Sequence, residues 1–331
     1  MPNVFLRLVV TLAVLCAPVA ASAQATHLLI VVGLAGDPEH GELFRKWGSK
    51  LVDAATTKLG VPKENVAYLS DEDTPVAPAT GRSTREEVAK AFAALASKAG
   101  EDDTVMIVLF GHGTFDGKIA KFNLPGPDMS PADFAPLLAH LRSKRIVFVD
   151  TASASGPFVE ALSGPGRIVL AATRTGAEKF ATLFGGPFVD AFSTEAADTD
   201  RNGRVSVLEA FSYAKQQVAA EYQREGLLQT EHALLDDNGD KEGSMDPGPQ
   251  AKDGQAAAAL SLGAARAEAA PANEQLRALY AERDALERRI ESLKLLKSGM
   301  DPDKYAAELE KLATELALKG RQIREAEGKV K

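Results

Sequence analysis

Short apolar runs alternate with amphipathic segments along residues 24–190. The apolar runs have the length and the β-branched content of strands that are buried on both faces. They lie at His27–Val32, Asn65–Ser70, Val105–Phe110, Ile146–Val149 and Arg167–Ala172. The segments between them carry apolar residues at helical spacing. Because strands that alternate with helices form parallel sheets covered on both faces, the pattern predicts an α/β fold with a mostly parallel sheet.

Capping residues and turn residues predict where several of these elements begin. A first helix is predicted from about Glu42, and a capping box of Ser83 and Glu86 is predicted for a second helix. Ser130 is the expected N-cap of a third helix, because a proline occupies its first position. A small hairpin or an extended excursion is expected over Phe115–Leu124.

The pattern changes character after residue 187. A helix is predicted over Phe188–Ala197, followed by an acidic loop and a long helix over Val205–Glu225. Leu234–Gly248 is interpreted as a polar tail. Gln255–Asn273 is rich in Ala and Gly, which is typical of a linker.

Two heptad-like series of apolar residues follow near the C-terminus. They comprise Leu276, Leu279, Leu286, Ile290 and Leu293, and then Tyr305, Leu309, Leu312, Leu316 and Ile323. A Gly/Pro turn separates them, so the spacing predicts an antiparallel helical hairpin or coiled coil. Such a hairpin would serve either self-association and partner docking or simple packing on the main domain.

The N-terminus has the features of a cleavable signal peptide. Arg7 precedes the apolar run Leu8–Ala20, which is too short to span a membrane, and Ala21-Ser22-Ala23 has the small-x-small form of a cleavage site. The protein is therefore expected to be secreted or periplasmic; an uncleaved anchor is the alternative. The predicted organisation is a signal peptide (1–23), an α/β domain (24–190), an acidic segment and tail completing it (191–250), a linker (251–272) and a helical hairpin (273–331).

Charge and cysteine content exclude several classes of function. The net charge of −8 argues against nucleic-acid binding. Cys16 is the single cysteine and lies within the predicted signal peptide. A mature chain without cysteine has no disulfide, no thiolate metal site and no cysteine nucleophile.

Two predicted strand ends carry candidate catalytic residues. His112 lies between two glycines directly after the strand that ends at Phe110, and Ser153 follows the strand that ends near Val149. Ligands of open α/β sheets bind beyond the carboxyl ends of the strands. If these strands are neighbours, His112 can act as a base, Ser153 as a nucleophile and the Gly113 N–H as an oxyanion donor. Otherwise the His caps a loop and the Ser satisfies its own turn.

The order of these features resembles the legumain (asparaginyl endopeptidase) family and its relatives, the caspases and gingipains. The resemblance covers roughly Thr26–Ser193 and includes His112-Gly113, which matches the catalytic His and the oxyanion glycine. The loop Thr151–Gly156 matches the region around the family's nucleophile through its Ala152, Ser155 and Gly156. The resemblance implies a caspase/legumain-like sheet that binds peptides.

The family's nucleophile is a cysteine, whereas this chain carries Ser153. A thiol with a pKa near ~8.5 is partly ionised at neutral pH, but an alcohol needs a closely hydrogen-bonded base. The favoured hypothesis is a catalytically impaired pseudopeptidase that binds peptides or protein partners with calcium dependence. The alternatives are an active serine-dependent hydrolase using Ser153 and His112, and a scaffold whose only ligand is calcium.

The acidic loop between the last two predicted helices of the α/β region matches the EF-hand pattern. The expected Ca²⁺ ligands are the side chains of Asp198, Asp200, Asn202, Ser206 and Glu209 and the carbonyl of Arg204. Gly203 provides the sharp turn at position six. An acidic loop without an ion is the alternative.

A second acidic stretch, Asp236–Asp240, has Lys241 where the EF-hand pattern requires glycine, and no Glu follows at position twelve. It could form a weak calcium site or contribute to the first one. The favoured interpretation is a solvated turn.

Overall fold

The computed structural model describes residues 24–262 and 301–327, together with residues 278–279, 282–283, 285–286, 289–290 and 293. The predicted signal peptide, residues 1–23, lies outside the described residues, as do residues 263–272 of the predicted linker.

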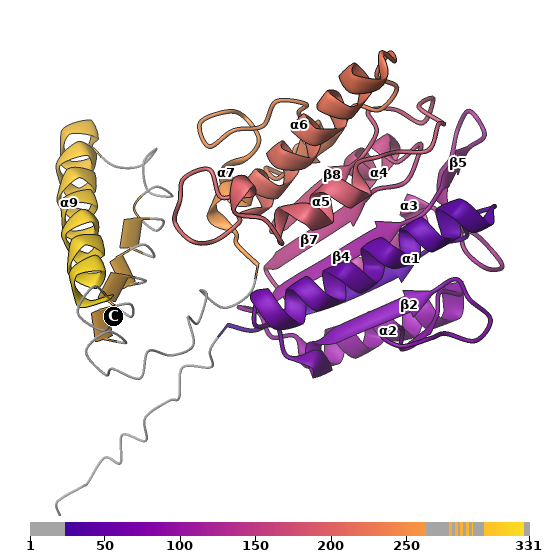
Figure 1. Ribbon diagram of the computed structural model, residues 1–331, viewed down its shortest axis with the longest axis horizontal. Coiled ribbons are helices and arrows are strands. Elements are labelled where there is room, and N and C mark those ends of the chain that lie inside the picture. The colour runs from indigo at the N-terminus through magenta and orange to yellow at the C-terminus, as the bar shows by residue number, and fades with distance from the viewer. Residues whose placement is uncertain are drawn as a thin grey trace, which may run out of the picture.

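A seven-stranded sheet forms the centre of the α/β domain, with the strand order β3-β2-β1-β4-β7-β8-β9 (Figure 1). The strands are β1 (Thr26–Val32), β2 (Val66–Ser70), β3 (Gly81–Arg82), β4 (Thr104–Phe110), β7 (Arg145–Asp150), β8 (Arg167–Ala171) and β9 (Leu234–Asp236). Neighbouring strands are parallel except for β8 and β9. The predicted mostly parallel sheet is confirmed.

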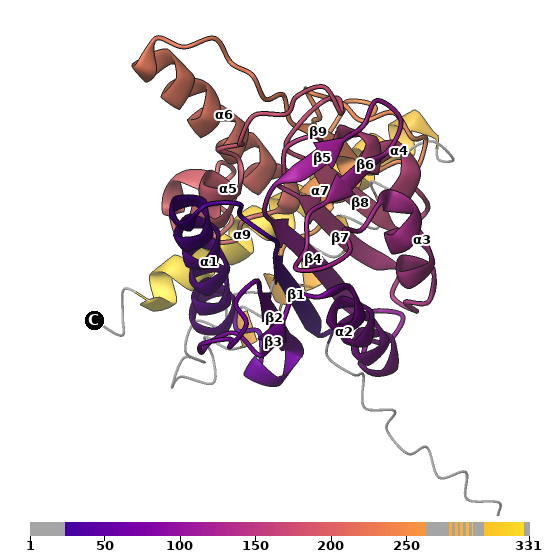
Figure 2. The same cartoon turned by 90° about the vertical axis from the view of Figure 1, so that its right-hand side faces the viewer.

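Helices cover both faces of this sheet (Figure 2). One face carries α1 (Pro38–Asp53), α5 (Gly185–Ala191) and α6 (Val207–Glu225), and the other carries α2 (Arg85–Lys98), α3 (Pro131–Ala139) and α4 (Gly156–Leu162). The shorter helical segments are η1 (Ala54–Lys58), η2 (Lys63–Asn65), η3 (Glu195–Ala197) and α7 (Gln255–Ala259).

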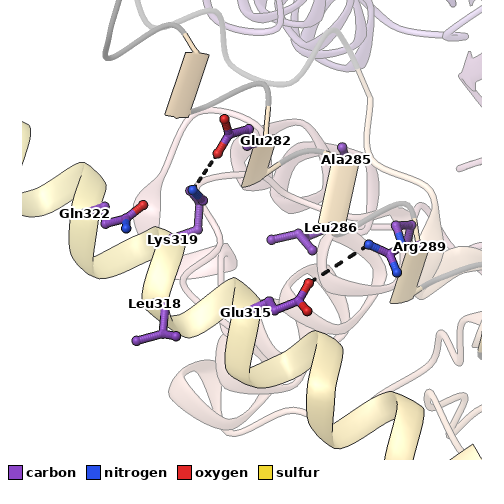
Figure 3. Close-up of a pocket in the computed structure, with 8 residues that line it drawn as sticks. All are labelled: Glu282, Ala285, Leu286, Arg289, Glu315, Leu318, Lys319 and Gln322. Carbon is purple, nitrogen blue, oxygen red and sulfur yellow. Dashed lines mark ion pairs between the residues drawn. The ribbon is translucent and has the colours of Figure 1, made fainter.

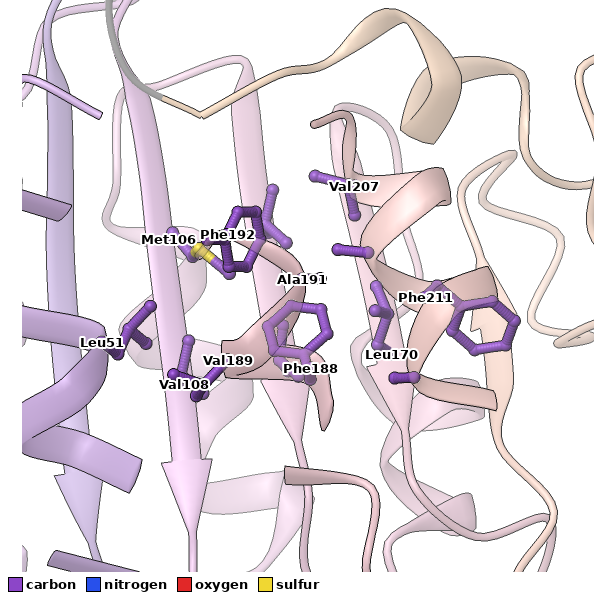
Figure 4. Close-up of a cluster of buried hydrophobic side chains, with 14 of the residues drawn as sticks. Leu51, Met106, Val108, Leu170, Phe188, Val189, Ala191, Phe192, Val207 and Phe211 are labelled. Atoms are coloured by element: carbon purple, nitrogen blue, oxygen red, sulfur yellow. The ribbon is translucent and has the colours of Figure 1, made fainter. Parts of the chain in front are cut away.

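Alternation along the central strands divides the core into two layers. Met106 and Val108 of β4 face the layer that contains Phe188 and Phe211, as Figure 4 shows. Residues 105, 107 and 109 of the same strand face the opposite layer. Each fully buried large apolar side chain contributes about 1.5–3 kcal/mol, so both layers hold the strand in place. The strand ends that carry the candidate catalytic residues are therefore fixed by the core.

The first helix begins earlier than its apolar pattern predicts. It starts at Pro38 instead of Glu42, with Asp37 as its N-cap. The Asp37 carboxylate accepts a hydrogen bond from the His40 N–H at 2.9 Å, and proline is favoured at the first helical position. The first turn of α1 lacks the large apolar residues on which the prediction relied, so the predicted start lies too late in the sequence.

The predicted capping box at Ser83 and Glu86 is wrong by one residue. Thr84 is the N-cap of α2, and its hydroxyl accepts a hydrogen bond from the Glu87 N–H at 3.3 Å. Ser83 is fully buried and donates to the carbonyl of Val32 at 2.6 Å. A tertiary hydrogen bond therefore takes the hydroxyl that the local pattern assigned to the cap.

The hairpin and the helices around it follow the predictions more closely. The hairpin consists of β5 (Gly113–Phe115) and β6 (Ala120–Phe122) and starts two residues earlier than predicted. Ser130 caps α3 in a capping box with Asp133. The helix predicted over 188–197 is divided into α5 and η3.

The stretch interpreted as a tail and linker is partly built into the domain. Leu234 belongs to β9, which pairs antiparallel with β8 at the sheet edge. Leu260 and Leu262 are buried in the core, and the Leu260 carbonyl accepts a hydrogen bond from the Val207 N–H at 2.8 Å. The linker interpretation is therefore wrong for residues 255–262, because these apolar side chains complete the layer beside α6.

The C-terminal region contains α9 (Pro302–Glu327). Leu312 of α9 packs with Leu286, Ile290 and Leu293, as the predicted hairpin requires. Ion pairs join the same segments: Lys319–Glu282 at 2.5 Å, Arg289–Glu308 at 3.7 Å and Arg289–Glu315 at 4.0 Å. Figure 3 shows the first and the last of them. Within the described part of the chain, no helix has both the length and the apolarity that a membrane crossing requires.

Candidate functional site

The ends of β4 and β7 bring the two candidate catalytic segments together. These strands are adjacent and parallel, with Leu109 opposite Asp150. The Gly113 N–H donates to Ser153 Oγ at 3.1 Å, and this hydroxyl is also 3.1 Å from the Gly113 carbonyl, to which it donates. A Cβ at Gly113 would lie 2.1 Å from the Ser153 carbonyl oxygen, so the backbone approach itself requires glycine.

The loop that carries Ser153 has a constrained backbone. Ala154 adopts a φ of +56°, and its N–H donates to the Glu178 carbonyl at 2.8 Å. Gly156 donates its N–H to Thr173 Oγ1 at 3.0 Å, and a Cβ on Gly156 would lie 2.4 Å from the backbone of residue 174. Ser155 is bonded to the same threonine hydroxyl at 3.2 Å. The Ser-Gly pair thus anchors the loop to the segment after β8.

A buried carboxyl lies beneath this loop at the end of β7. Asp150 is fully buried, and its Oδ1 accepts a hydrogen bond from the Ala152 N–H at 3.0 Å. Its Oδ2 has no hydrogen-bond partner among the described residues. Burial raises the pKa of Asp150 to about 7, because the single backbone hydrogen bond compensates only in part for the lost hydration of the charged form. The sequence pattern did not single out this residue, since it simply ends an apolar strand.

His112 contacts the start of α1. Its ring centre lies 4.9 Å from that of His40 and 5.1 Å from that of Phe44. Burial lowers the pKa of His112, and the neighbouring His40 lowers it further. The imidazole is therefore neutral at pH 7 and can accept a proton or bind a metal ion.

His112 and Ser153 do not form a catalytic hydrogen bond in this structure. Among the described residues, the hydrogen bonds of the Ser153 hydroxyl go to Gly113 alone. The side chain of Ser153 is also buried, with an exposed fraction of 2%. The structure therefore joins Ser153 to Gly113, the expected oxyanion glycine, and shows no hydrogen bond between Ser153 and His112, the expected base.

Two carboxylates outside the predicted site hold the neighbouring loops. Glu178 accepts hydrogen bonds from the N–H groups of Arg174 and His232 at 2.9 and 3.0 Å. Glu231 accepts from the Leu183 and Phe184 N–H groups at 2.8 and 3.2 Å, and burial raises its pKa to about 7. Together they tie the segment after β8 to the segment after α6. The sequence pattern did not predict the contacts with Leu183 and His232, because each joins residues that lie about 50 positions apart in the chain.

The predicted calcium loop places its acidic side chains around one point. Oxygen atoms of Asp198, Asp200 and Glu209 lie within 4.8 Å of one another. Gly203 has a φ of +82°, and its N–H donates to Asp198 Oδ2 at 2.8 Å. The amide oxygen of Asn202, another predicted ligand, accepts from the Arg204 N–H at 2.8 Å. These groups offer the carboxylate and amide oxygens that Ca²⁺ prefers.

The charge state of the loop follows from crowding of its carboxylates. Burial raises the pKa of Asp200, and the negative charges of Glu209 and Asp198 add to that effect. Burial also works against ionisation of Glu209, but hydrogen bonds from Ser206 and Thr199 outweigh it and lower its pKa. Ser206 is the N-cap of α6 and forms a capping box with Glu209, so the last predicted ligand also defines the start of the helix.

The second acidic stretch differs from the solvated turn that its composition suggested. Asp236 is fully buried, and its Oδ2 accepts a hydrogen bond from the Lys241 N–H at 3.0 Å. Lys241 takes the left-handed conformation, with a φ of +73°, at the position where the EF-hand pattern has glycine. Asp236, Asp240 and Asp253 bring their carboxylates within 4.8 Å of one another. The solvated-turn interpretation is therefore wrong for Asp236, which β9 carries into the domain.

Comparison with known proteins gives one family match. Residues 81–235 match the model of the Peptidase C13 family. This segment runs from β3 to β9 and contains His112, Ser153 and the predicted calcium loop. The curated proteins contain no match to the chain.

Proposed function

Because residues 81–235 belong to the peptidase C13 family, we propose that this protein is a secreted, catalytically impaired member of it that binds peptides or protein partners. The proposal combines the legumain-like peptidase fold with a substituted nucleophile. Binding would occur at the sheet edge that carries His112 and Ser153, where ligands of open α/β sheets are found.

The hydrogen bonding of Ser153 is the observation that carries the proposal. Its hydroxyl is buried, donates to the Gly113 carbonyl and accepts from the Gly113 N–H. A serine reacts only when a base takes its proton, and His112 makes no hydrogen bond with it in the described structure. The frame around the nucleophile is thus retained while the group that activates it is not engaged.

Calcium dependence and secretion are the other parts of the proposal. The oxygen cluster of Asp198, Asp200 and Glu209 supports a Ca²⁺ site at the start of α6. Its occupation would reduce the repulsion among these carboxylates and so stabilise the helix that packs on α5. The apolar N-terminal run followed by Ala21-Ser22-Ala23 supports export through a signal peptide.

The experiment compares binding and cleavage in the mature protein. A fluorogenic peptide library is incubated with the wild type and with Ser153→Ala, with calcium and with EGTA, and binding is followed by fluorescence anisotropy. We expect calcium-dependent binding of a subset of peptides without cleavage. Cleavage by the wild type that Ser153→Ala abolishes would establish the serine-dependent hydrolase, in which the Gly113 N–H, here donated to Ser153 Oγ, would serve as the oxyanion donor.

A cysteine variant tests whether the frame around residue 153 still supports chemistry. Ser153→Cys should react with a thiol-directed peptide electrophile faster than Ser97→Cys, a control placed on the exposed face of α2. His112→Ala in the Ser153→Cys background should abolish the difference, because the thiolate then lacks its base. If no peptide binds and the two thiols react alike, the protein is better described as a scaffold whose ligand is calcium.

A further inference from the structure

Three metal-binding side chains converge beside the candidate catalytic histidine. Asp37 and His40 come from the first turn of α1, and His112 follows β4. One potential ligand atom from each residue lies within 4.8 Å of the other two. We propose that this cluster binds one divalent transition-metal ion, with Zn²⁺ as the best match, through His40, His112 and Asp37.

The relative position of the two imidazoles fits a shared ion. Their ring centres are 4.9 Å apart and their planes are inclined by 60°. Two imidazoles that bind one Zn²⁺ at ~2.0–2.1 Å in tetrahedral geometry place their ring centres about 5 Å apart. The rings therefore need only side-chain adjustment to bind the same ion.

The carboxylate already approaches one of these rings. Asp37 Oδ2 lies 2.8 Å from His40 Nδ1, and Asp37 Oδ1 accepts a hydrogen bond from the His40 N–H at 2.9 Å. The bond from the His40 N–H holds the carboxylate at the start of the helix. Asp37 Oδ2 can then bind a metal ion in place of its hydrogen bond with the His40 ring. Imidazole nitrogen with one carboxylate favours Zn²⁺ and related ions over Ca²⁺, which prefers oxygen ligands alone.

An aromatic side chain packs against the two imidazoles of the cluster. Phe44 packs against both imidazoles, with ring centres 5.1 and 5.8 Å away. Asp37 is exposed and both histidines are half-buried, so the cluster is accessible to solvent. The arrangement thus has the features of an open metal site.

Metal binding would have a direct consequence for the proposed function without depending on it. An ion bound to His112 takes the lone pair that this residue needs as a base, so the metal-loaded protein cannot use His112 in hydrolysis. The site is also separate from the calcium loop, which offers oxygen ligands between η3 and α6. The two ions should therefore bind independently.

The test measures zinc binding to the untagged mature protein in calcium-containing buffer by calorimetry, with the visible absorption of Co²⁺ as a second probe. We expect one equivalent to bind at this site. His40→Ala and His112→Ala should each weaken zinc binding by about 100-fold or more, because loss of even an outer-shell partner costs about 10–100-fold. Asp37→Ser removes the carboxylate but keeps an N-cap for α1, and should weaken binding by at least about 10-fold.

Two controls make the result specific. His140→Ala removes an exposed histidine at the end of α3, and Glu209→Gln alters the calcium loop; neither should change the zinc affinity of this site. A cooperative thermal unfolding transition like that of the wild type in the His40 and His112 variants shows that they are folded. Absence of zinc and cobalt binding in the wild type, or unchanged affinity in His40→Ala, would overturn the inference. Both readouts are independent of peptide binding and cleavage.

Discussion

Replacing Asp150 with asparagine should make the protein more stable at high pH. Asp150 is fully buried at the end of β7, one of its carboxylate oxygens has no partner in the described structure, and its pKa rises to about 7. The folded protein therefore keeps this proton up to about pH 7, whereas the unfolded chain releases it near the ordinary value of 3.8. Stability contributed by the protonated form is consequently lost as the pH rises between these values.

The magnitude follows from the difference between the two pKa values. One pKa unit corresponds to about 1.36 kcal/mol, so the raised pKa of Asp150 destabilises the folded protein relative to the unfolded chain by about 4.3 kcal/mol at pH 8 and by about 1.7 kcal/mol at pH 5. The amide introduced by Asp150→Asn would keep the acceptor for the Ala152 N–H but bury an unpaired N–H group, at a cost of about 1–3 kcal/mol. That cost does not depend on pH. The stability of Asp150→Asn relative to the wild type should therefore rise by about 2.6 kcal/mol between pH 5 and pH 8.

Urea unfolding at several pH values between 5 and 8 measures this difference directly. The wild type, Asp150→Asn and the exposed control Asp102→Asn are compared at fixed calcium concentration, so that ion binding does not alter the comparison. The control should follow the wild type throughout. A relative stability of Asp150→Asn that is the same at pH 5 and pH 8 would refute the reasoning, because it would mean that Asp150 titrates alike in the folded and unfolded states.

Three further predictions test the calcium loop, the nucleophile loop and the domain organisation. Glu209→Gln should abolish most of the rise in melting temperature that calcium produces, while Glu225→Gln at the far end of α6 should leave it intact; equal melting temperatures in calcium and EGTA for the wild type would refute the site. Gly156→Ala should destabilise the protein by more than about 2 kcal/mol in urea unfolding, whereas Gly164→Ala, whose Cβ would meet no atom closer than 3.8 Å, should change stability by under about 1 kcal/mol. A chain ending at residue 272 should retain the calcium-dependent thermal shift; loss of folding would show that the C-terminal helices belong to the main core.

The sequence predicted the central sheet because its signal is strong and local. Runs such as Val105–Phe110 are apolar at every position, which only a strand with two covered faces accommodates. The same reasoning failed where a short element depends on a distant partner. Leu234 begins a three-residue strand that exists because β8 leaves an edge for it, and Leu260 is buried because α6 passes over it. Neither segment carries a periodic pattern of its own.

The candidate site was predictable to the extent that it lies at strand ends. His112 and Ser153 stand out because polar residues follow apolar runs, and parallel strands bring such ends to one edge. Asp37 and His40 lie at the same edge, but as the N-cap and a first-turn residue of an amphipathic helix they have local roles that explain them fully. Their contact with His112 depends on how α1 packs on the sheet, which no local pattern specifies.

Gly113 and Gly156 are explained by the geometry of the backbone and need no catalytic role. Any side chain at Gly113 would collide with the carbonyl of Ser153, and any at Gly156 with the backbone after Thr173. Both positions therefore require glycine whether or not the protein is a hydrolase. A motif that contains these glycines indicates the fold and does not by itself indicate catalysis. The backbone does not constrain the side chain at position 153 in this way. The Ser153 hydroxyl forms hydrogen bonds with the N–H and the carbonyl of Gly113. We therefore propose that chemistry at this site depends on Ser153 and His112, whereas the glycines around them fix the backbone that positions the two residues.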